Sequence, residues 1–220
     1  MKRKTLILIA VCILALAFGL VACNKTSDDA KSDNICRLTE QFYAGESENF
    51  YASIECGRRE KTFIADGVAR EVVDFCELCI LPLKSNSLEG ISYQIWGGQN
   101  SLSGEVKAGR HGEIVASITL DFIPEKIVLT ASDNNDEIEL SSVLDGAITA
   151  LDAINVAKDA LKENIQKEYD DGKPEREIYV KLISADRVNY YYYVSFIGDG
   201  VDYWAMLINP KTEEIVSKKS

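Results

Sequence analysis

The stretch from residue 35 to about residue 143 is divided into eight short apolar runs, and this division most constrains the fold. Polar or glycine-containing turns separate the runs at intervals of roughly 8 to 12 residues. Short strands at such intervals are typical of a β-sandwich or a β-barrel. The segment Ile35 to Tyr43 fits either a short helix or an edge segment. The expected strands are Asn49 to Glu55, Lys61 to Ala65, Val72 to Leu81, Gly90 to Trp96, Leu102 to Ala108, Glu113 to Asp121, Lys126 to Ala131 and Glu137 to Ser142.

The pattern changes in the last third of the chain. Thr149 and Asp152 have the spacing of a helix capping box, with Asp in place of the usual Glu or Gln. Apolar residues then recur at three- to four-residue intervals, which predicts an amphipathic helix that ends near Tyr169. Gly172 follows as a helix terminator. Further strands are expected at Glu177 to Ser184, Tyr190 to Ile197, Val201 to Ile208 and Glu214 to Ser217.

The first 23 residues combine a basic start, an apolar segment and a cysteine. Lys2-Arg3-Lys4 precedes Leu6 to Gly19, which is shorter than the roughly 20 residues needed to span a bilayer. The next four residues, Leu20-Val21-Ala22-Cys23, resemble the lipobox of a bacterial lipoprotein. This resemblance implies cleavage after Ala22, a diacylglycerol on the Cys23 thiol and an N-acyl group such as palmitate on the new amino terminus.

The last third contains, in order, Ile148-Thr149, Asp152-Ala153, Ala157, Tyr190 to Phe196, Asp199-Gly200, Tyr203 and Asn209 to Ile215. These residues resemble a PepSY-like domain, a small α+β module of secreted and membrane-attached bacterial proteins. The resemblance covers about Ile148 to Lys218. The family's closing turn usually reads Asp-x-x-Thr-Gly-Glu-Ile or Val, whereas Asn209 and Glu213 replace the Asp and the Gly here. A left-handed residue at this turn is therefore expected to be strained.

These patterns predict an α+β chain. An N-terminal all-β sandwich is expected to precede the PepSY-like domain, for which the resemblance implies one helix packed on an antiparallel sheet. We expect a signal peptide at 1–22, a lipidated cysteine and flexible tether at 23–34, the sandwich at 35–145 and the PepSY-like domain at 146–220. Members of the PepSY-like family are generally non-enzymatic, which implies a role in binding, peptidase restraint or envelope sensing.

The charge of the chain narrows its partners. Without its first 22 residues the chain has 21 basic and 35 acidic residues, a formal charge of −14. Nucleic acid is not expected as a partner, because binding to phosphates needs clustered Lys and Arg. We expect a lipid-anchored protein on the extracytoplasmic face of the cell membrane. Its membrane contact would be through the acylated Cys23 alone, and no other cofactor is expected.

Four cysteines remain after the signal and the lipidation site are set aside. Cys36, Cys56, Cys76 and Cys79 permit two disulfides in three connectivities, and four reduced thiols are the alternative. If Val72 to Leu81 is a strand, Cys76 and Cys79 point to opposite faces about 10 Å apart, which is too far for a bond. They would then pair with Cys36 and Cys56. A helix over the same segment is the other interpretation.

The strand Tyr190 to Ile197 is aromatic on both of its faces. Tyr191 and Tyr193 alternate with other aromatic residues, and Trp204 lies on the following strand. We expect Tyr191, Tyr193 and Trp204 on the face away from the helix. Tyr and Trp are enriched at interfaces, so this face is predicted to bind a protein or peptide partner in the cell envelope. Contact with the sandwich of the same chain is the alternative.

Groups for catalysis are scarce in the sequence. His111 is the only histidine and lies between glycines in a predicted turn, and no serine has the Gly-x-Ser-x-Gly context. The cysteines offer one close pair, whereas structural zinc sites usually have two. We therefore expect neither a catalytic nor a metal site. The alternatives to a binding or regulatory role are a carboxylate-dependent hydrolase or carbohydrate-active protein using the sandwich domain, and a structural accessory of an envelope complex.

Overall fold

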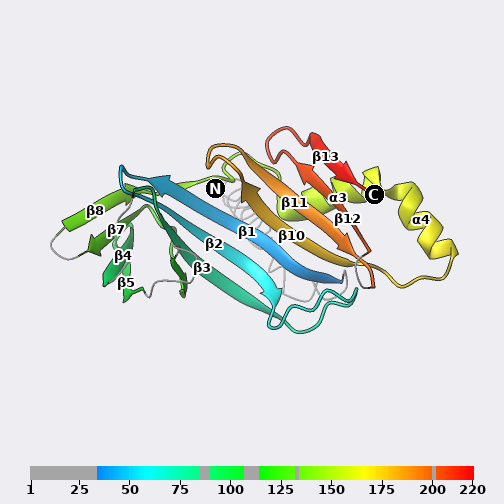
Figure 1. The fold of residues 1–220 in the computed structure, drawn as a ribbon, viewed down its shortest axis with the longest axis horizontal. Coiled ribbons are helices and arrows are strands. Elements are labelled where there is room, and N and C mark those ends of the chain that lie inside the picture. Colours follow the sequence, from blue (N-terminus) through cyan, green and yellow to red (C-terminus); the bar gives the residue numbers. More distant parts are fainter. Residues whose placement is uncertain (1–33, 85–89, 107–113, 132–133, 200–201) are drawn as a thin grey trace, which may run out of the picture. The chain divides into compact units, whose positions relative to one another are not determined.

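The computed structural model describes residues 34–84, 90–106, 114–131, 134–199 and 202–220, so Cys23, the expected signal and tether, and His111 lie outside the described residues. Two sheets form most of the described structure (Figure 1). The strands are β1 (Ile35–Glu46), β2 (Phe50–Glu60), β3 (Val72–Pro82), β4 (Ile91–Gly97), β5 (Asn100–Glu105), β6 (Ile114–Ser117), β7 (Lys126–Ala131), β8 (Asn134–Glu139), β9 (Ser141–Ser142), β10 (Glu177–Ser184), β11 (Tyr190–Ile197), β12 (Tyr203–Ile208) and β13 (Ile215–Lys219). The helices are α3 (Ala150–Ala160) and α4 (Lys162–Asp170).

The larger sheet has the order β13-β12-β11-β10-β1-β2-β3-β6, with β9 also paired to β1. Strand β1 pairs in parallel with β10 and antiparallel with β2, so it lies in the middle of this sheet. The expectation of an α+β chain, with a separate small PepSY-like domain whose own antiparallel sheet lies under one helix, is therefore wrong. The described structure is mostly β, with two helices. The backbone of β10 bonds to β1 instead of forming a sheet edge, which removes an unpaired row of N–H and C=O groups.

The smaller sheet, β5-β4-β7-β8, is antiparallel and gives the structure its sandwich-like part. Its inward side chains pack against those of β1, β2, β3 and β6 in one buried cluster. Alternation explains this packing, because successive side chains of a strand point to opposite faces. The cluster includes Ile54, Leu78, Ile80, Ile91, Ile95, Ile114, Ile127, Leu129 and Ile138, none of them more than 1% exposed.

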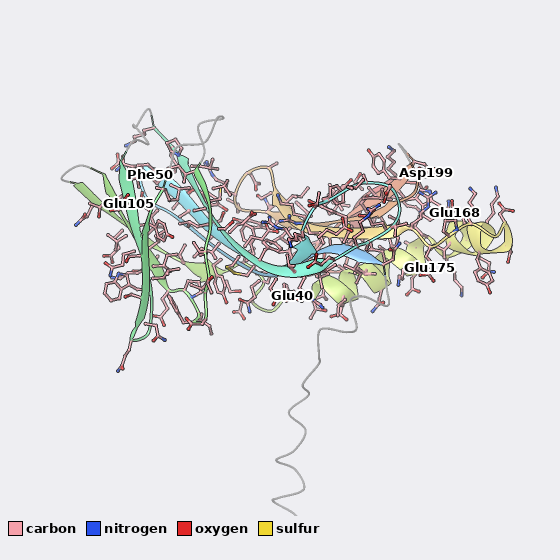
Figure 2. The ribbon with its side chains drawn as sticks, turned by 90° about the horizontal axis from the view of Figure 1, so that it is seen from below. Glu40, Phe50, Glu105, Glu168, Glu175 and Asp199 are labelled. Atoms are coloured by element: carbon pink, nitrogen blue, oxygen red, sulfur yellow. A yellow bond between two sulfur atoms is a disulfide. The ribbon has the colours of Figure 1, made fainter. Side chains whose placement is uncertain are left out.

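The second buried cluster lies under helix α3. Ala153, Ala157 and Leu161 are fully buried against alternate residues of β10, β11 and β12. The predicted capping box is present: the Thr149 hydroxyl accepts a bond from the Asp152 N–H, and the Asp152 carboxylate accepts one from the Thr149 N–H. Helix α3 covers one face of β10 to β12, and Figure 2 shows both helices on the same side of the sheet.

Two local features explain details of the sequence pattern. The register between β1 and β2 shifts between Thr39 and Gln41, a β-bulge that adds one residue to β1 and interrupts the ladder. In the closing turn, Glu213 has a φ of 61°, so the strained left-handed residue expected there is present. The predicted strand at Lys61 to Ala65 is wrong, because residues 61–71 form an irregular segment between β2 and β3.

Candidate ligand-binding site

The face of the large sheet away from α3 carries a cavity of about 470 Å³. This volume lies within the range of roughly 300 to 1,000 Å³ that is typical of small-molecule sites. The sheet forms the floor, and the segment 61–71 forms one wall, on the side opposite the helices (Figure 2). The lining residues are Cys36, Arg37, Arg59, Glu60, Phe63, Ala65, Tyr179, Tyr193, Ser195, Ile197 and Tyr203.

Strand alternation places the tyrosines on this face. In β11 the residues Tyr192, Val194 and Phe196 pack under the helix, so the residues between them face the cavity. Residues opposite one another in a ladder share a face, and the register pairs Tyr179 with Ser195 and Ile197 with Tyr203. Three adjacent strands therefore contribute to one surface.

Aromatic rings form a continuous wall of the cavity. The ring centroids of Phe63 and Tyr179 are 5.6 Å apart with an interplanar angle of 54°, and those of Tyr179 and Tyr193 are 6.4 Å apart at 71°. Inclined arrangements of this kind are favoured by the quadrupoles of the rings. Burial raises the pKa of Tyr179, so its hydroxyl stays protonated at neutral pH and keeps its hydrogen for a bond.

Two arginines lie directly opposite one another in β1 and β2. Arg37 pairs with Arg59 in the ladder, an arrangement that by itself is repulsive. Each arginine has a carboxylate partner: Arg37 Nη2 is 2.8 Å from Glu55 Oε1, and Arg59 Nη1 is 2.6 Å from Glu77 Oε1. The Phe75 ring contacts both guanidinium groups, each 4.7 Å from its centroid. The cationic groups are thus held in fixed positions.

Buried carboxylates hold the segment 61–71 over this part of the sheet. Glu177, at the start of β10, is fully buried, and its Oε2 accepts a bond of 3.2 Å from the Gly67 N–H. Glu60 is 3% exposed and accepts a short bond from the Arg70 N–H. Oxygen Oε1 of Glu177 and Oε2 of Glu60 are buried without a hydrogen-bond partner among the described residues.

Asn34 ties the same segment to the start of β1. Its Nδ2 donates to the Gly67 carbonyl at 2.9 Å, and its Oδ1 accepts from the Ala69 N–H at 2.7 Å. Asn34 has a positive φ of 54°, which its short polar side chain tolerates better than most. One side chain therefore satisfies two backbone groups of segment 61–71.

The Cys36 thiol lies beside these carboxylates and is buried. Burial raises its pKa, and the neighbouring Glu177 carboxylate raises it further. The thiol donates to the Ile178 carbonyl at a distance of 3.2 Å. Burial also raises the pKa of Glu177, and the nearby Glu60 carboxylate acts in the same direction. Because the thiolate is the reactive form of cysteine, Cys36 is a poor nucleophile in this environment.

The residues predicted for partner binding lie in different places. Tyr193 lines the cavity, and Tyr191 lies on the same face of β11 outside that cavity. Trp204 is on the opposite face, 7% exposed in the cluster under α3, and its ring is 3.8 Å from the Arg176 guanidinium carbon. The register explains this placement, since Trp204 lies opposite Phe196, which faces the helix.

The cysteines confirm the strand interpretation of Val72 to Leu81. Cys56 and Cys76 are opposite one another in β2 and β3 and form a disulfide with Cα atoms 4.1 Å apart. Cys36 is a buried thiol, and Cys79 is partly buried on the face of β3 opposite to that of Cys76. Of the expected bridges from Cys76 and Cys79 to Cys36 and Cys56, the structure shows Cys56–Cys76.

Sequence reasoning missed most of the cavity. Arg37 could not be identified as a lining residue because the sequence leaves β1 unassigned. Phe63 could not be identified because the sequence predicts a strand within segment 61–71. Arg59, Glu60 and Tyr179 had no motif to mark them. The signal that the sequence does offer is the adjacent apolar pair Phe63 and Ile64, which the structure leaves about half exposed and of which Phe63 lines the cavity.

No protein-family model, curated protein or solved structure matches this chain. Among the described residues, neither helix has the length and apolar character needed to cross a membrane. The same residues hold no group of three or more side chains suited to bind a metal ion.

Proposed function

We propose that this chain is a lipid-anchored protein of the extracytoplasmic membrane face that binds a small ligand without transforming it. The anchor is proposed from the lipobox-like residues that end at Cys23. The site is proposed to be the cavity between the large sheet and segment 61–71. The acidic mature chain supports attachment through the lipid alone, because anionic membranes attract basic surfaces.

The observation that carries the proposal is the concave, aromatic-lined cavity of about 470 Å³. Small-molecule sites are concave and largely apolar, with a few polar groups that orient the ligand. A stable protein partner, in contrast, covers about 800 Å² on each side of an interface. The size and shape of the cavity therefore favour the binding of a small ligand over the docking of a folded protein.

The chemistry of the lining supports binding over catalysis. The buried Cys36 thiol has a raised pKa and donates its hydrogen to a backbone carbonyl. Glu55 and Glu77, the carboxylates nearest the two arginines, are both held in ion pairs. Glu60 is buried and accepts a backbone N–H. These groups are engaged in holding the sheet and segment 61–71 together.

Lipidation is tested by metabolic labelling with an alkyne fatty acid in a bacterial host. The full-length chain is expected to take up the label and to sediment with membranes after a high-salt wash. Cys23→Ala should lose the label and remain an uncleaved precursor, because diacylglycerol transfer to the thiol precedes cleavage. Cys36→Ala serves as the matched control and should label as the wild type does. Labelling of Cys23→Ala would contradict the anchor.

The binding site is tested by a ligand-observed NMR screen of small molecules with the full-length chain in lipid nanodiscs. Compounds that bind the wild type are expected to be lost when Ala65→Trp fills the cavity from segment 61–71. Tyr191→Ala, on the same sheet face but outside this cavity, should keep them. Binding that survives Ala65→Trp unchanged would show that the cavity is not the site.

A further inference from the structure

We infer that the cavity takes an aromatic molecule that carries a carboxylate. This inference rests on the proposed function, because it specifies the ligand of the same site. Three features support it: the placement of the two arginines, the charges around the cavity rim, and the inclined aromatic wall.

The arginines offer donors to a planar anion. Arg59 lines the cavity, uses Nη1 for Glu77 and has a side chain that is 32% exposed, so it keeps N–H donors beyond that ion pair. Arg37 also lines the cavity and uses Nη2 for Glu55, with its side chain 11% exposed. Guanidinium groups present parallel N–H donors that match the two oxygens of a carboxylate.

Two arginines and one glutamate line the cavity, although the whole chain has a formal charge of −11. Lys219 Nζ is 3.4 Å from the ring centroid of Tyr203, and Lys181 lies opposite Tyr193 in the ladder. Glu60 is the one carboxylate in the cavity lining, and it is 3% exposed. Within the lining, arginine is therefore more accessible than carboxylate, which favours an anion over a cation.

The aromatic wall suits a ring on the same ligand. Phe63, Tyr179 and Tyr193 are inclined to one another by 54° and 71°, so a ligand ring can meet one of them face to face and another edge to face. Phe63 is 49% exposed and belongs to segment 61–71, so it can contact a ligand from the side opposite the sheet. A carboxylate at the arginines and a ring at this wall would fill both parts of the cavity.

The experiment compares three probes that share one ring and differ in charge: 3-phenylpropionate, 3-phenylpropanamide and 3-phenylpropylammonium. Binding is measured at pH 7 by titration calorimetry with the full-length chain in zwitterionic nanodiscs, and empty nanodiscs correct for partition into lipid. The carboxylate is expected to bind at least tenfold more tightly than the amide. The ammonium is expected to bind more weakly than the amide.

A paired variant isolates the role of the arginine. Arg59→Gln together with Glu77→Gln removes the exposed guanidinium group without leaving an unpaired carboxylate. This variant is expected to bind the carboxylate and the amide within twofold of each other. Tyr191→Ala should keep the tenfold preference, because Tyr191 does not line the cavity.

The outcomes separate the ligand class from the proposed function. If the amide or the ammonium binds as tightly as the carboxylate, the anionic class is overturned while the cavity remains a ligand site. If none of the probes binds at millimolar concentration, the aromatic carboxylate class is overturned. The screen with Ala65→Trp then decides separately whether the cavity binds small molecules at all.

Discussion

Replacing Cys56 and Cys76 together with alanine is expected to lower the free energy of unfolding by about 3 kcal/mol. The disulfide joins β2 to β3 over a sequence separation of 20 residues, so its main effect is to restrict the unfolded chain. That enclosed stretch contains segment 61–71, one wall of the cavity. We therefore expect the same variant to bind cavity ligands more weakly.

Urea denaturation of the wild type, with and without a reductant, measures the effect without mutation. The reduced wild type and the double variant should unfold at similar midpoints, both below that of the oxidised protein. Cys36→Ala is the control for loss of a cysteine outside the bond, and it should respond to reductant as the wild type does. An unchanged midpoint on reduction would contradict the role assigned to the disulfide.

Replacing Arg176 with methionine is expected to lower the free energy of unfolding by about 2 to 3 kcal/mol. This is less than the loss for a fully buried ion pair, because the partners are partly exposed. Arg176 donates to both Glu168 oxygens, at 2.8 and 2.6 Å, and to Asp202 at 2.6 Å, while it stacks 3.8 Å from the Trp204 ring. Glu168, labelled in Figure 2, belongs to α4, so the Arg176 side chain joins the second helix to the sheet. Its removal leaves the Glu168 carboxylate, whose side chain is 15% exposed, with the longer 3.4 Å bond from Lys173 Nζ.

The pH dependence gives this prediction a second readout. The bond from Arg176 lowers the pKa of Glu168 in the folded state. A lowered pKa contributes stability that is present above the unfolded value, near 4.5, and that is lost as the pH falls through the folded value. The difference between wild type and Arg176→Met should therefore shrink in acid. The double variant Glu168→Gln with Arg176→Met should lose less stability than Arg176→Met alone. If Arg176→Met lost the same stability at all pH values, the ion pair would be contradicted.

The elements with regular alternation or clear caps could be predicted from the sequence. Strand β11 and the Thr149 cap are confirmed, because each depends on local spacing alone. Strand β1 could not be assigned, since its bulge at Thr39 to Gln41 breaks the alternation. Leu38 and Phe42 are four residues apart, which is also a helical spacing, although they lie on a strand.

The candidate site was predictable only in part. Alternation predicted that Tyr193 faces away from the helix, but the face of Trp204 depends on the register of β12 against β11, which the sequence does not reveal. Arg37 and Tyr179 meet through the parallel pairing of β1 with β10. Contacts between strands so distant in the sequence have no local signal.

The central position of β1 has a consequence for how the chain folds. Cys36 in β1 and Ile178 in β10 are 142 positions apart, so β1 is among the first strands to be synthesised and among the last to gain both neighbours. Pairings of such long range fold slowly, and an unpaired strand is prone to bond to other chains. The nascent protein should therefore depend on a holding chaperone until its last third has been made.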